Sequence, residues 1–540
     1  MTRYLGGLIT ADETKTIPAN NFQDTSASGI WTLSEAEMLN KQSLWPTAGN
    51  VNTAKFVENI FSIDTYTGTG SNLTVTTGID TLNEGGLIWL KRRDSAVSYG
   101  LFDTVRGTNQ QLLSDTTGAS EDGSSSNNRL YEFTSTGFKV GDHDFGANNG
   151  EYVAWTFRKA PKFFDVVQYS GTGSEQSIAH NLGQVPGMII HKRTDTSEDW
   201  RVYHRMANGG SSPEDYIIQL NGDDDYSNDN TNFGAPSSTH FTVKTSSGTN
   251  NGSGTYIAYL FGHDTSSDGM IQCGYYTGNG SSSGPTVTLG FEPQWVLVKR
   301  SSGGQAEWIL VDEIRGNSEG AYNAGYYLSP NQNNAETGGG GLVKFTSTGF
   351  RIGDTSSKVN TSGSNYIYVA IRRAPMATPT ARSDVFHVEL KTAGGTQTFN
   401  TGFPVDMLMN PIVADAASGT SPDNVPITSR LQGPREGVGV YLRSQNDSAE
   451  QAGSGFGWNL NFANQYIMKD VHSGTQDHVG YAWRRAPKYF DVVTYTGNST
   501  AGRTINHNLG AVPDMIWIKM RSSSAAAIAY TRGWVVTSLH

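Results

Sequence analysis

Short apolar runs separated by turn residues fill most of the chain after about residue 55. Between residues 163 and 261 these runs read FFDVVQYSG, GMIIHKR, WRVYHRM, DYIIQL, HFTVKTS and GTYIAYLF. Runs of this length, rich in β-branched and aromatic residues and bounded by Gly, Asn, Ser and Pro, are typical of β-strands. Helical periodicity longer than two turns is absent from these stretches. The pattern predicts an all-β chain of tandem antiparallel β-sandwich or jelly-roll-like domains.

The same segments recur along the chain at a nearly constant interval. The closing motif R-(K/R)-A-P begins at Arg158, Arg372 and Arg484, so the first two copies are 214 residues apart and the last two 112. FTSTGFKVGD at 133–142 returns as FTSTGFRIGD at 345–354. Self-similarity at a fixed period indicates tandem copies of one structural unit, and a period of about 108 residues accounts for these intervals.

These copies divide the chain into four full repeats, a short fifth repeat and a leader. The second copy of the closing motif is degenerate, because YIAYLFGHD keeps the strand and loses the Arg and the Pro. We expect an N-terminal attachment segment at 1–54, repeats at 55–162, 163–269, 270–384 and 385–488, and a partial repeat at 489–540. The partial repeat holds only the opening hairpins. Either the chain is truncated there, or a neighbouring subunit supplies the missing strands.

The leader differs from the repeats. Ser34 and Glu37 form a capping box that predicts one short helix, and Pro46 lies just beyond its end. Trp31 and Trp45 flank this helix as apolar anchors. Because about 50 residues bury little surface alone, we expect this segment to dock onto symmetry mates or onto a larger particle through Trp31 and Trp45.

Composition and charge narrow the functional classes. Aromatic residues make up 11% of the chain and charged residues 16%, which excludes disorder driven by charge. A net charge of −11 argues against a nucleic-acid partner, since phosphate binding needs clustered Lys and Arg. The single cysteine forms no intramolecular bridge, which suits folding in a reducing cytoplasm. The N-terminus lacks the apolar stretch of a signal peptide and the chain lacks a long apolar run, so we expect no membrane insertion.

Motifs that could carry chemistry each have a simpler structural interpretation. Residues 280–284 match G-x-S-x-G, but they lack the strand–turn–helix context that exposes the serine. The acidic cluster at 223–229 offers oxygen ligands for calcium, yet the other repeats lack it, which favours a solvated hairpin tip. His180 and His507 recur in H-N-L-G-x-V-P turns, where a buried ring bonded to its own turn explains the repetition as well as a ligand role does. Cys273 is interpreted as a buried strand residue. We therefore expect no catalytic residue, no metal, no cofactor and no enzymatic activity.

Aromatic side chains near divergent loops are the remaining candidates for binding. Trp200, Tyr203 and Tyr226 lie in or near the stretches where the repeats differ most. Surface receptors are held by stacking on Trp and Tyr together with a few polar groups, so these three residues are the predicted receptor contacts. The alternative is that they belong to the core, as most such residues do.

The opening Y-(S/T)-G, the H-N-L-G-x-V-P turn, the F-T-S-T-G-F-x-(V/I)-G-D hairpin and the closing R-(K/R)-A-P together resemble repeat modules in structural proteins of marine tailed bacteriophages, often labelled tail fibre proteins. The resemblance covers about residues 55–540, and the leader also resembles segments of such proteins. Repeat 2 departs from it at the R-A-P position and repeat 4 at the F-T-S-T-G-F position. It implies synthesis in the host bacterial cytoplasm and assembly into the virion beside other tail or capsid proteins.

The leading hypothesis is a tail fibre or tail-associated adhesin that attaches through its N-terminus. Repeated domains would then meet a host surface glycan or protein, and several weak sites on a homo-oligomer, with a trimer as the usual state of fibres, would raise avidity. Two alternatives stay open. One is a capsid decoration, collar or adaptor protein with no receptor role, and the other is a glycan depolymerase.

Overall fold

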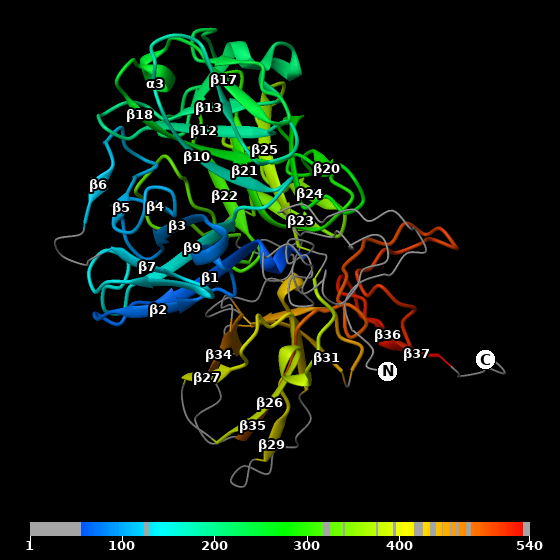
Figure 1. The fold of residues 1–540 in the computed structure, drawn as a ribbon. Coiled ribbons are helices and arrows are strands. Elements are labelled where there is room, and N and C mark those ends of the chain that lie inside the picture. Colours follow the sequence, from blue (N-terminus) through cyan, green and yellow to red (C-terminus); the bar gives the residue numbers. More distant parts are fainter. Residues whose placement is uncertain are drawn as a thin grey trace, which may run out of the picture.

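The computed structural model describes residues 56–532, apart from 124–128, 317–324, 339–340, 374–375, 393–395, 415–424, 433–438, 445, 454–455, 461–463 and 471–476. Nearly every regular element in this part of the chain is a strand (Figure 1). The two α-helices, α2 (Thr81–Glu84) and α3 (Ser247–Asn250), have four residues each. The prediction of an all-β, antiparallel fold is confirmed. The predicted leader helix and its flanking Trp31 and Trp45 lie outside the described residues.

The first repeat is a sandwich of two antiparallel sheets. The larger sheet has the order β1 (Phe61–Thr67), β9 (Glu151–Arg158), β3 (Gly86–Arg92), β4 (Gly100–Asp103), and the smaller has β2 (Leu73–Thr76), β8 (Gly137–Val140), β7 (Leu130–Thr134). A further two-stranded ladder joins β5 (Gln110–Gln111) and β6 (Glu121–Asp122). The closing strand β9 is thus central in its sheet, which explains its continuous apolar sequence, EYVAWTFR, buried on both faces.

The second and third repeats reproduce this order. In the second, the larger sheet runs β10 (Phe164–Ser170), β18 (Thr255–Phe261), β12 (Met188–Arg193), β13 (Arg201–His204), β14 (Tyr216–Gln219), β15 (Ser227–Asn228), and the smaller β11 (Gln176–Ala179), β17 (His240–Val243), β16 (Phe233–Gly234). In the third, the larger runs β19 (Ile271–Thr277), β25 (Asn365–Arg372), β21 (Pro293–Arg300), β22 (Ile309–Asp312), and the smaller β20 (Thr286–Thr288), β24 (Gly349–Ile352), β23 (Val343–Thr346).

The fourth repeat has both sheets, and in the fifth the described residues form one hairpin. The larger sheet of the fourth runs β26 (Phe386–Lys391), β35 (Asp477–Trp483), β28 (Met407–Met409), β30 (Pro426–Ser429), β31 (Gly439–Arg443), β32 (Gln451–Gly453), with β29 (Ile412–Ala414) also paired to β35. Its smaller sheet runs β27 (Thr396–Asn400), β34 (Gln465–Asp470), β33 (Phe456–Asn459). The hairpin joins β36 (Met515–Ile518) to β37 (Ile528–Thr531). Each of these sheets lies inside one of the repeats expected from the sequence.

A stacked pair of tyrosines joins the opening and closing strands inside each of the first three sandwiches. The ring centroids are 5.1 Å apart for Tyr66 and Tyr152 and 5.2 Å apart for Tyr169 and Tyr256. The third pair, Tyr276 and Tyr366, has the same spacing of 5.1 Å. The tyrosine of the recurring Y-(S/T)-G motif is therefore a core residue of its own sandwich.

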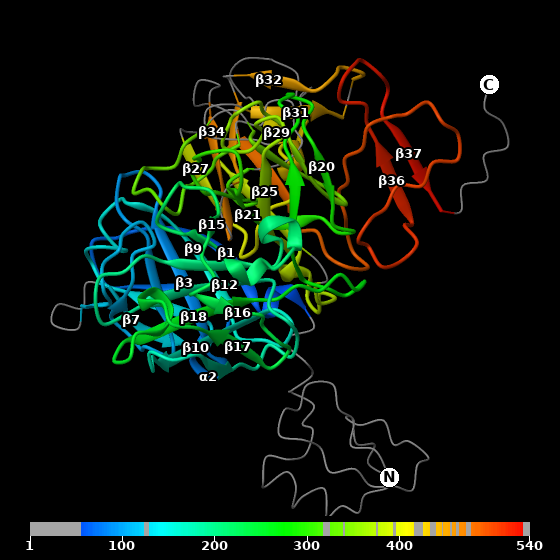
Figure 2. The same cartoon turned by 90° about the horizontal axis from the view of Figure 1, so that it is seen from above.

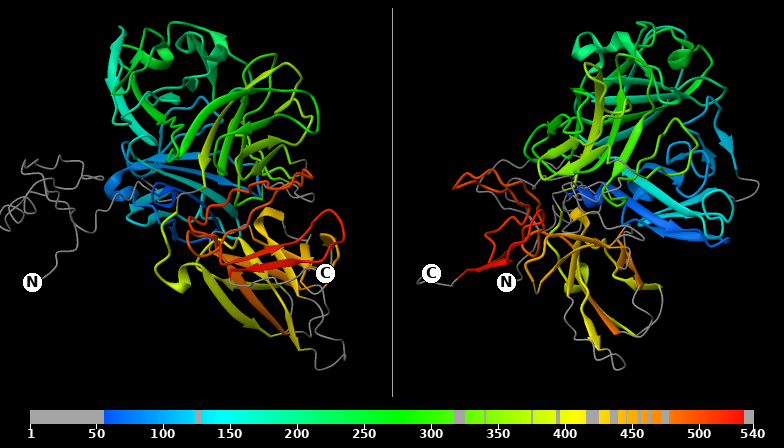
Figure 3. Two further views of the ribbon diagram at one scale, coloured as in Figure 1. Left: turned by 90° about the vertical axis from the view of Figure 1, so that its right-hand side faces the viewer. Right: turned by 180° about the vertical axis from the view of Figure 1, so that it is seen from behind.

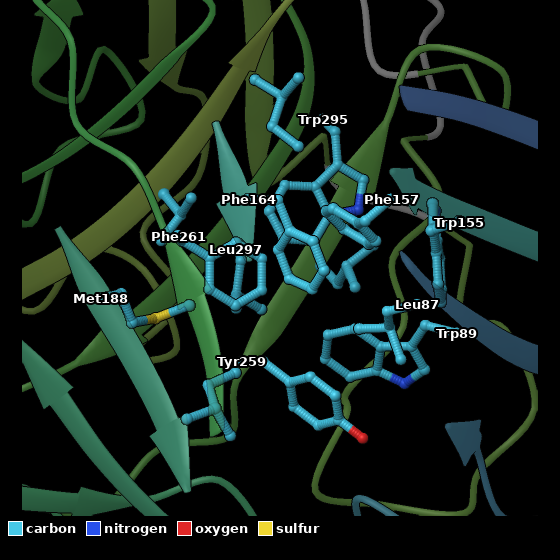
Figure 4. Close-up of a cluster of buried hydrophobic side chains, with 14 of the residues drawn as sticks. Leu87, Trp89, Trp155, Phe157, Phe164, Met188, Tyr259, Phe261, Trp295 and Leu297 are labelled. Carbon is cyan, nitrogen blue, oxygen red and sulfur yellow. The ribbon is translucent and has the colours of Figure 1, made fainter. Parts of the chain in front are cut away.

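The first three repeats share a second core, formed by the outer faces of their larger sheets. Figure 4 shows side chains from all three repeats directed into it. They include Trp89 and Trp155 from repeat 1, Tyr259 from repeat 2, and Trp295 and Leu297 from repeat 3, each at most 1% exposed. Repeats 1–3 thus form one unit, which we call the block. They are not separate domains that only a linker connects. Figure 3 shows the block from two further sides, with the fourth repeat packed against it.

Tight turns at the A-P motif join repeat 1 to repeat 2 and repeat 4 to repeat 5. The N–H of Ala160 donates to the carbonyl of Phe164 (2.9 Å), and the N–H of Phe164 donates back to the carbonyl of Ala160 (3.1 Å). Ala486 and Phe490 exchange the same two bonds, at 2.9 and 3.2 Å. Each turn includes one lysine with a left-handed φ of 61°. These bonds fix the direction in which the next repeat leaves.

Candidate functional site

A buried lysine on the third strand links each repeat of the block to the repeat before it. Lys192, at the end of β12 in repeat 2, is fully buried. Its ammonium donates to the carbonyl of Thr117 in repeat 1 (3.0 Å) and to that of Glu198 in its own loop (2.8 Å). The ammonium therefore crosses the interface between repeats 1 and 2. A side chain of this length is needed to reach both carbonyls.

Equivalent lysines close the other two interfaces. Lys299 of repeat 3 donates to the carbonyls of Asp223 (3.0 Å) and Asp224 (2.7 Å) in repeat 2. Lys91 of repeat 1 donates to the carbonyl of Asn333 in repeat 3 (3.2 Å). Repeat 2 is thus joined to 1, 3 to 2, and 1 to 3, so the three contacts close a ring. We call Lys91, Lys192 and Lys299 the lysine latches.

The ammonium groups of the latches are buried away from water. Burial lowers the pKa of each of the three ammonium groups to about 8, because it removes the charged form from water. Backbone carbonyls compensate in part, since charge-assisted hydrogen bonds are stronger than neutral ones. The signal in the sequence is a Lys-Arg pair at the end of an apolar strand, at 91–92, 192–193 and 299–300, and these residues were not among the predicted site residues.

The acidic cluster of repeat 2 belongs to the same interface. Besides the two carbonyls that bind Lys299, the Asp224 carboxylate accepts from Gln305 (2.7 Å) and that of Asp225 from the N–H of Gly304 (3.1 Å). The interpretation as a hairpin tip agrees with the pairing of β14 and β15, and Asp224 is exposed, but the loop also packs against repeat 3. Within the described residues, no group of three or more His, Cys, Asp or Glu is placed to hold a metal ion.

Trp200 lies in the interface between repeats 1 and 2 and is not exposed to solvent. Its side chain is fully buried, and its indole N–H donates to the carbonyls of Leu113 (3.0 Å) and Thr116 (3.2 Å) in repeat 1. Trp308 occupies the matching place in repeat 3 and donates to the carbonyl of Gln219 in repeat 2 (2.9 Å). Both residues directly precede the fourth strand of their sheet. They fill the space between neighbouring repeats.

The other two predicted receptor contacts are also turned inward. Tyr203, on β13, is 3% exposed in the core of its own sandwich. Tyr226 is partly buried against the common core of the block, with its ring 6.3 Å from that of Tyr216. The prediction of a receptor contact is therefore wrong for Trp200 and Tyr203, which solvent does not reach, whereas for the partly buried Tyr226 it stays a prediction. The loops that carry them differ between repeats because each repeat interface is made by different residues.

Buried acids supply a second set of links within the block. The Asp103 carboxylate accepts from the Tyr259 hydroxyl of repeat 2 (2.8 Å) and from Nε of Arg106 (2.6 Å). Arg106 also donates to the Tyr259 hydroxyl (3.2 Å). Removal of one partner would leave a buried charge without compensation, which is strongly destabilising.

The corresponding acid in repeat 3 binds repeat 1. Asp312 accepts from the indole N–H of Trp155 (2.9 Å) and from Nε of Arg315 (2.7 Å). In repeat 2 a histidine replaces the acid. The Nε2 atom of His204 lies 3.2 Å from the carbonyl oxygen of Tyr368 in repeat 3, and burial lowers the pKa of His204 to about 3, which keeps the ring neutral. The ring of polar contacts is thus closed at all three interfaces.

The second basic residue of the closing motif ties the fourth repeat to the block. Arg485 donates to both carboxylate oxygens of Glu292 in repeat 3 (2.9 and 2.7 Å) and to Asp491 (2.5 Å). Arg373, at the end of repeat 3, bridges Glu313 and Asp406, both at 2.6 Å. Both arginines are nearly inaccessible to solvent. We call this set of ion pairs the junction.

A cleft of about 850 Å³ opens beside the junction. Its walls are the opening strand of repeat 1, residues 376–380 and residues 402–404 of repeat 4. Asp64 lines it, is 7% exposed, and has one carboxylate oxygen without a hydrogen-bond partner among the described residues. Burial raises the pKa of Asp64 to about 7. The group can therefore donate or accept a hydrogen bond near neutral pH. Repeats 2 and 3 have Val167 and Gly274 at this position, so the repeat pattern gave no signal for it.

The two recurring histidines bind their own turns. The Nδ1 atom of His180 accepts from the N–H of Leu182 (3.2 Å), and His507 accepts from Leu509 at the same distance. The expectation of a buried ring is confirmed for His180, whereas His507 is exposed. Cys273 is buried on β19, and burial raises the pKa of its thiol well above the ordinary range.

Comparison with known protein families gives a match that covers the block. Residues 58–375 match a family model described as a domain of unknown function (DUF7483). The matched range begins just before β1 and ends at the closing motif of repeat 3, so it covers the three interlocked repeats. No curated protein matches the chain. Among the residues that the structure describes, no helix has the length and apolar character needed to cross a membrane.

Proposed function

The chain belongs to the DUF7483 family, and we propose that it is a bacteriophage virion structural protein, a tail fibre or tail-associated adhesin attached through its N-terminal segment. The observation that carries this proposal is the closed, interlocked block of three repeats, to which the junction fixes a fourth. A rigid body of this kind suits a part that must hold its shape outside a cell. The likeness of its motifs to phage tail fibre modules supports the same role.

The construction of the block favours display over chemistry. Most of the large side chains and buried charges described above bind other repeats of the same chain. The outward-facing loops are then available to bind a partner. We propose a homo-oligomer, with a trimer as the expected form, in which many copies of a weak contact would raise avidity. A host surface glycan or protein is the partner that this role requires.

Competition for adsorption tests the receptor role. Host cells are incubated with the purified full chain, and the adsorption rate of the phage that carries the protein is then measured. An adhesin predicts slower adsorption as the concentration of free chain rises. An unchanged rate at saturating chain would reject the receptor role and leave a capsid decoration, collar or adaptor protein as the better assignment.

A glycan depolymerase is the third candidate, and the cleft beside Asp64 is the feature that favours it. The purified chain is incubated with host surface glycan, and new reducing ends are counted. Release that is lost in an Asp64→Asn variant would support this activity. We expect no release.

A further inference from the structure

The cleft beside the junction follows the edge of the first sandwich. β1 and β2 are edge strands of its two sheets, and every residue of both strands lines the cleft. The opposite wall includes residues 376–380, which connect repeats 3 and 4, and residues 402–404. Figure 1 shows β1 and β2 on the side of repeat 1 that faces repeat 4, and Figure 2 shows the same repeats from above. The cleft is therefore formed by several repeats together.

Asp64 differs from the other charged side chains of the cleft. The two arginines in its walls form ion pairs, Arg484 with Glu58 (2.9 Å) and Arg373 with Glu313 (2.6 Å). Asp64 is 7% exposed, and one of its carboxylate oxygens has no hydrogen-bond partner among the described residues. Buried polar groups nearly always have such a partner. The carboxyl of Asp64 therefore points to a ligand that supplies one.

The fold itself does not require an acid at this position. Asp64 faces Ala154 on the closing strand of repeat 1, as Val167 faces Ala258 in repeat 2. In repeat 3 the position is Gly274. Two sandwiches of the same topology thus form without the acid, and a buried carboxyl without a partner lowers stability. The acid is explained better by binding than by folding.

A hydroxyl is the ligand group that suits Asp64. Burial raises the pKa of Asp64 to about 7, so both protonation states are populated near neutral pH. A hydroxyl donates to the carboxylate and accepts from the carboxylic acid, whereas an ammonium group only donates. The hydroxyl can therefore bind in either state.

The walls of the cleft also suit a ligand with many hydroxyl groups. Thr74 and Thr76 on β2 are exposed, and so are Thr378 and Asn464. Their hydroxyl and amide groups both donate and accept hydrogen bonds. The volume of about 850 Å³ lies within the range of about 300–1,000 Å³ that is usual for small-ligand sites. The cleft is thus large enough for a short oligosaccharide.

We propose that this cleft binds an uncharged oligosaccharide of the host surface, one of whose hydroxyl groups hydrogen-bonds to the carboxyl of Asp64. The inference rests on the host-surface role proposed above and names the site and the class of ligand. Acidic sugars are disfavoured, because four acids and only two arginines line the cleft and both arginines are ion-paired.

The cleft should bind this glycan without cleaving it. Glycoside hydrolysis generally uses a pair of carboxyl groups. Two other acids in the walls are already engaged, Glu58 by Arg484 (2.9 Å) and Asp384 by the N–H of Ala381 (2.9 Å). Glu313 is paired with an arginine of the junction. Asp64 therefore lacks a free second carboxyl beside it among the described residues.

Calorimetry with host glycan tests the proposal. The surface polysaccharide of the host is partly hydrolysed and separated by anion exchange into uncharged and acidic oligosaccharides, and each fraction is titrated into the full chain. We expect the uncharged fraction to bind and the acidic fraction to bind more weakly. Asp64→Val should reduce the affinity for the uncharged fraction about tenfold or more. Its urea midpoint should not fall, because valine occupies this position in repeat 2.

Two further variants make the test specific. Glu132→Val is the matched control, because Glu132 is an acid of repeat 1 on β7, outside the cleft, and its side chain is 48% exposed. This variant should keep the native affinity. Thr76→Trp places a large side chain in the cleft from an exposed position of β2 and should also weaken binding.

The proposal fails if the uncharged fraction does not bind or if the acidic fraction binds more tightly. It also fails if Thr76→Trp binds as the native chain does while Asp64→Val either does the same or has a lower urea midpoint. Phage adsorption separates the site from the host-surface role. If free native chain and free Asp64→Val chain slow adsorption equally, the adhesin role stands and the cleft is not its site. If the native chain binds the uncharged fraction but leaves adsorption unchanged, the site stands and the adhesin role fails.

Discussion

Replacement of one lysine latch by an apolar side chain of similar length should weaken the whole block. Lys192→Met keeps the volume of the side chain but removes its ammonium, so the carbonyls of Thr117 and Glu198 lose their buried donor. A buried carbonyl without a partner costs about 1–3 kcal/mol. Relief of the desolvated charge offsets part of this cost. We therefore expect the block to lose about 2–4 kcal/mol of its free energy of unfolding.

Urea unfolding followed by tryptophan emission measures this loss. The block contributes most of the buried tryptophans, so its transition dominates the signal. Lys162→Met is the matched control. The Lys162 side chain is 61% exposed, and its ion pair with Asp264 spans 3.4 Å, so its removal should cost less than about 1 kcal/mol. If both variants unfold at the same urea concentration, the latch does not stabilise the block and the reasoning is refuted.

Three further outcomes follow from the same contacts. First, the latch ammonium groups have pKa values near 8 in the folded chain and near 10.4 in the unfolded one. The unfolded chain therefore binds more protons between these values, and the native block should gain stability over Lys192→Met as pH rises from about 8 to about 10, in urea titrations at each pH. Second, Arg485→Met leaves the Glu292 carboxylate buried without its partner and should destabilise the fourth repeat and its attachment by about 3–5 kcal/mol. Limited proteolysis between repeats 3 and 4 should speed up in this variant but not in Arg532→Met, an exposed control, and equal cleavage of the two would contradict the role of the junction. Third, Trp200→Phe removes one indole donor shared by two carbonyls and should cost about 1–3 kcal/mol, and an unchanged urea midpoint would show that the indole N–H adds nothing to the interface.

The sequence predicted the repeat and its strands because these depend on local pattern. The closing strand EYVAWTFR is apolar at successive positions, which indicates a strand covered on both faces, and it is central in its sheet. The tyrosine of Y-(S/T)-G recurs because each copy fills the same place in its own sandwich.

The packing of one repeat on another was not predictable in the same way. Trp155 binds Asp312, which is 157 residues further along the chain, and Arg93 binds Glu336 over 243 residues. The latch lysines recur with the repeat, but the partners that these side chains meet in other repeats do not follow from the period. The interfaces are also not alike in sequence, since Trp200 in repeat 2 and Trp308 in repeat 3 correspond to Tyr99 in repeat 1. The divergent loops lie where neighbouring repeats meet, so their divergence reflects contacts within the block.

The position of the chain on an intact phage particle tests the central claim most directly. Gold-labelled antibodies against the leader at 1–54 and against repeat 4 are applied to purified virions and located by electron microscopy. The proposal predicts both labels on the tail, with the leader label nearer the particle and the repeat-4 label further out. Virions without either label, or with the repeat-4 label nearer the particle than the leader label, would contradict it.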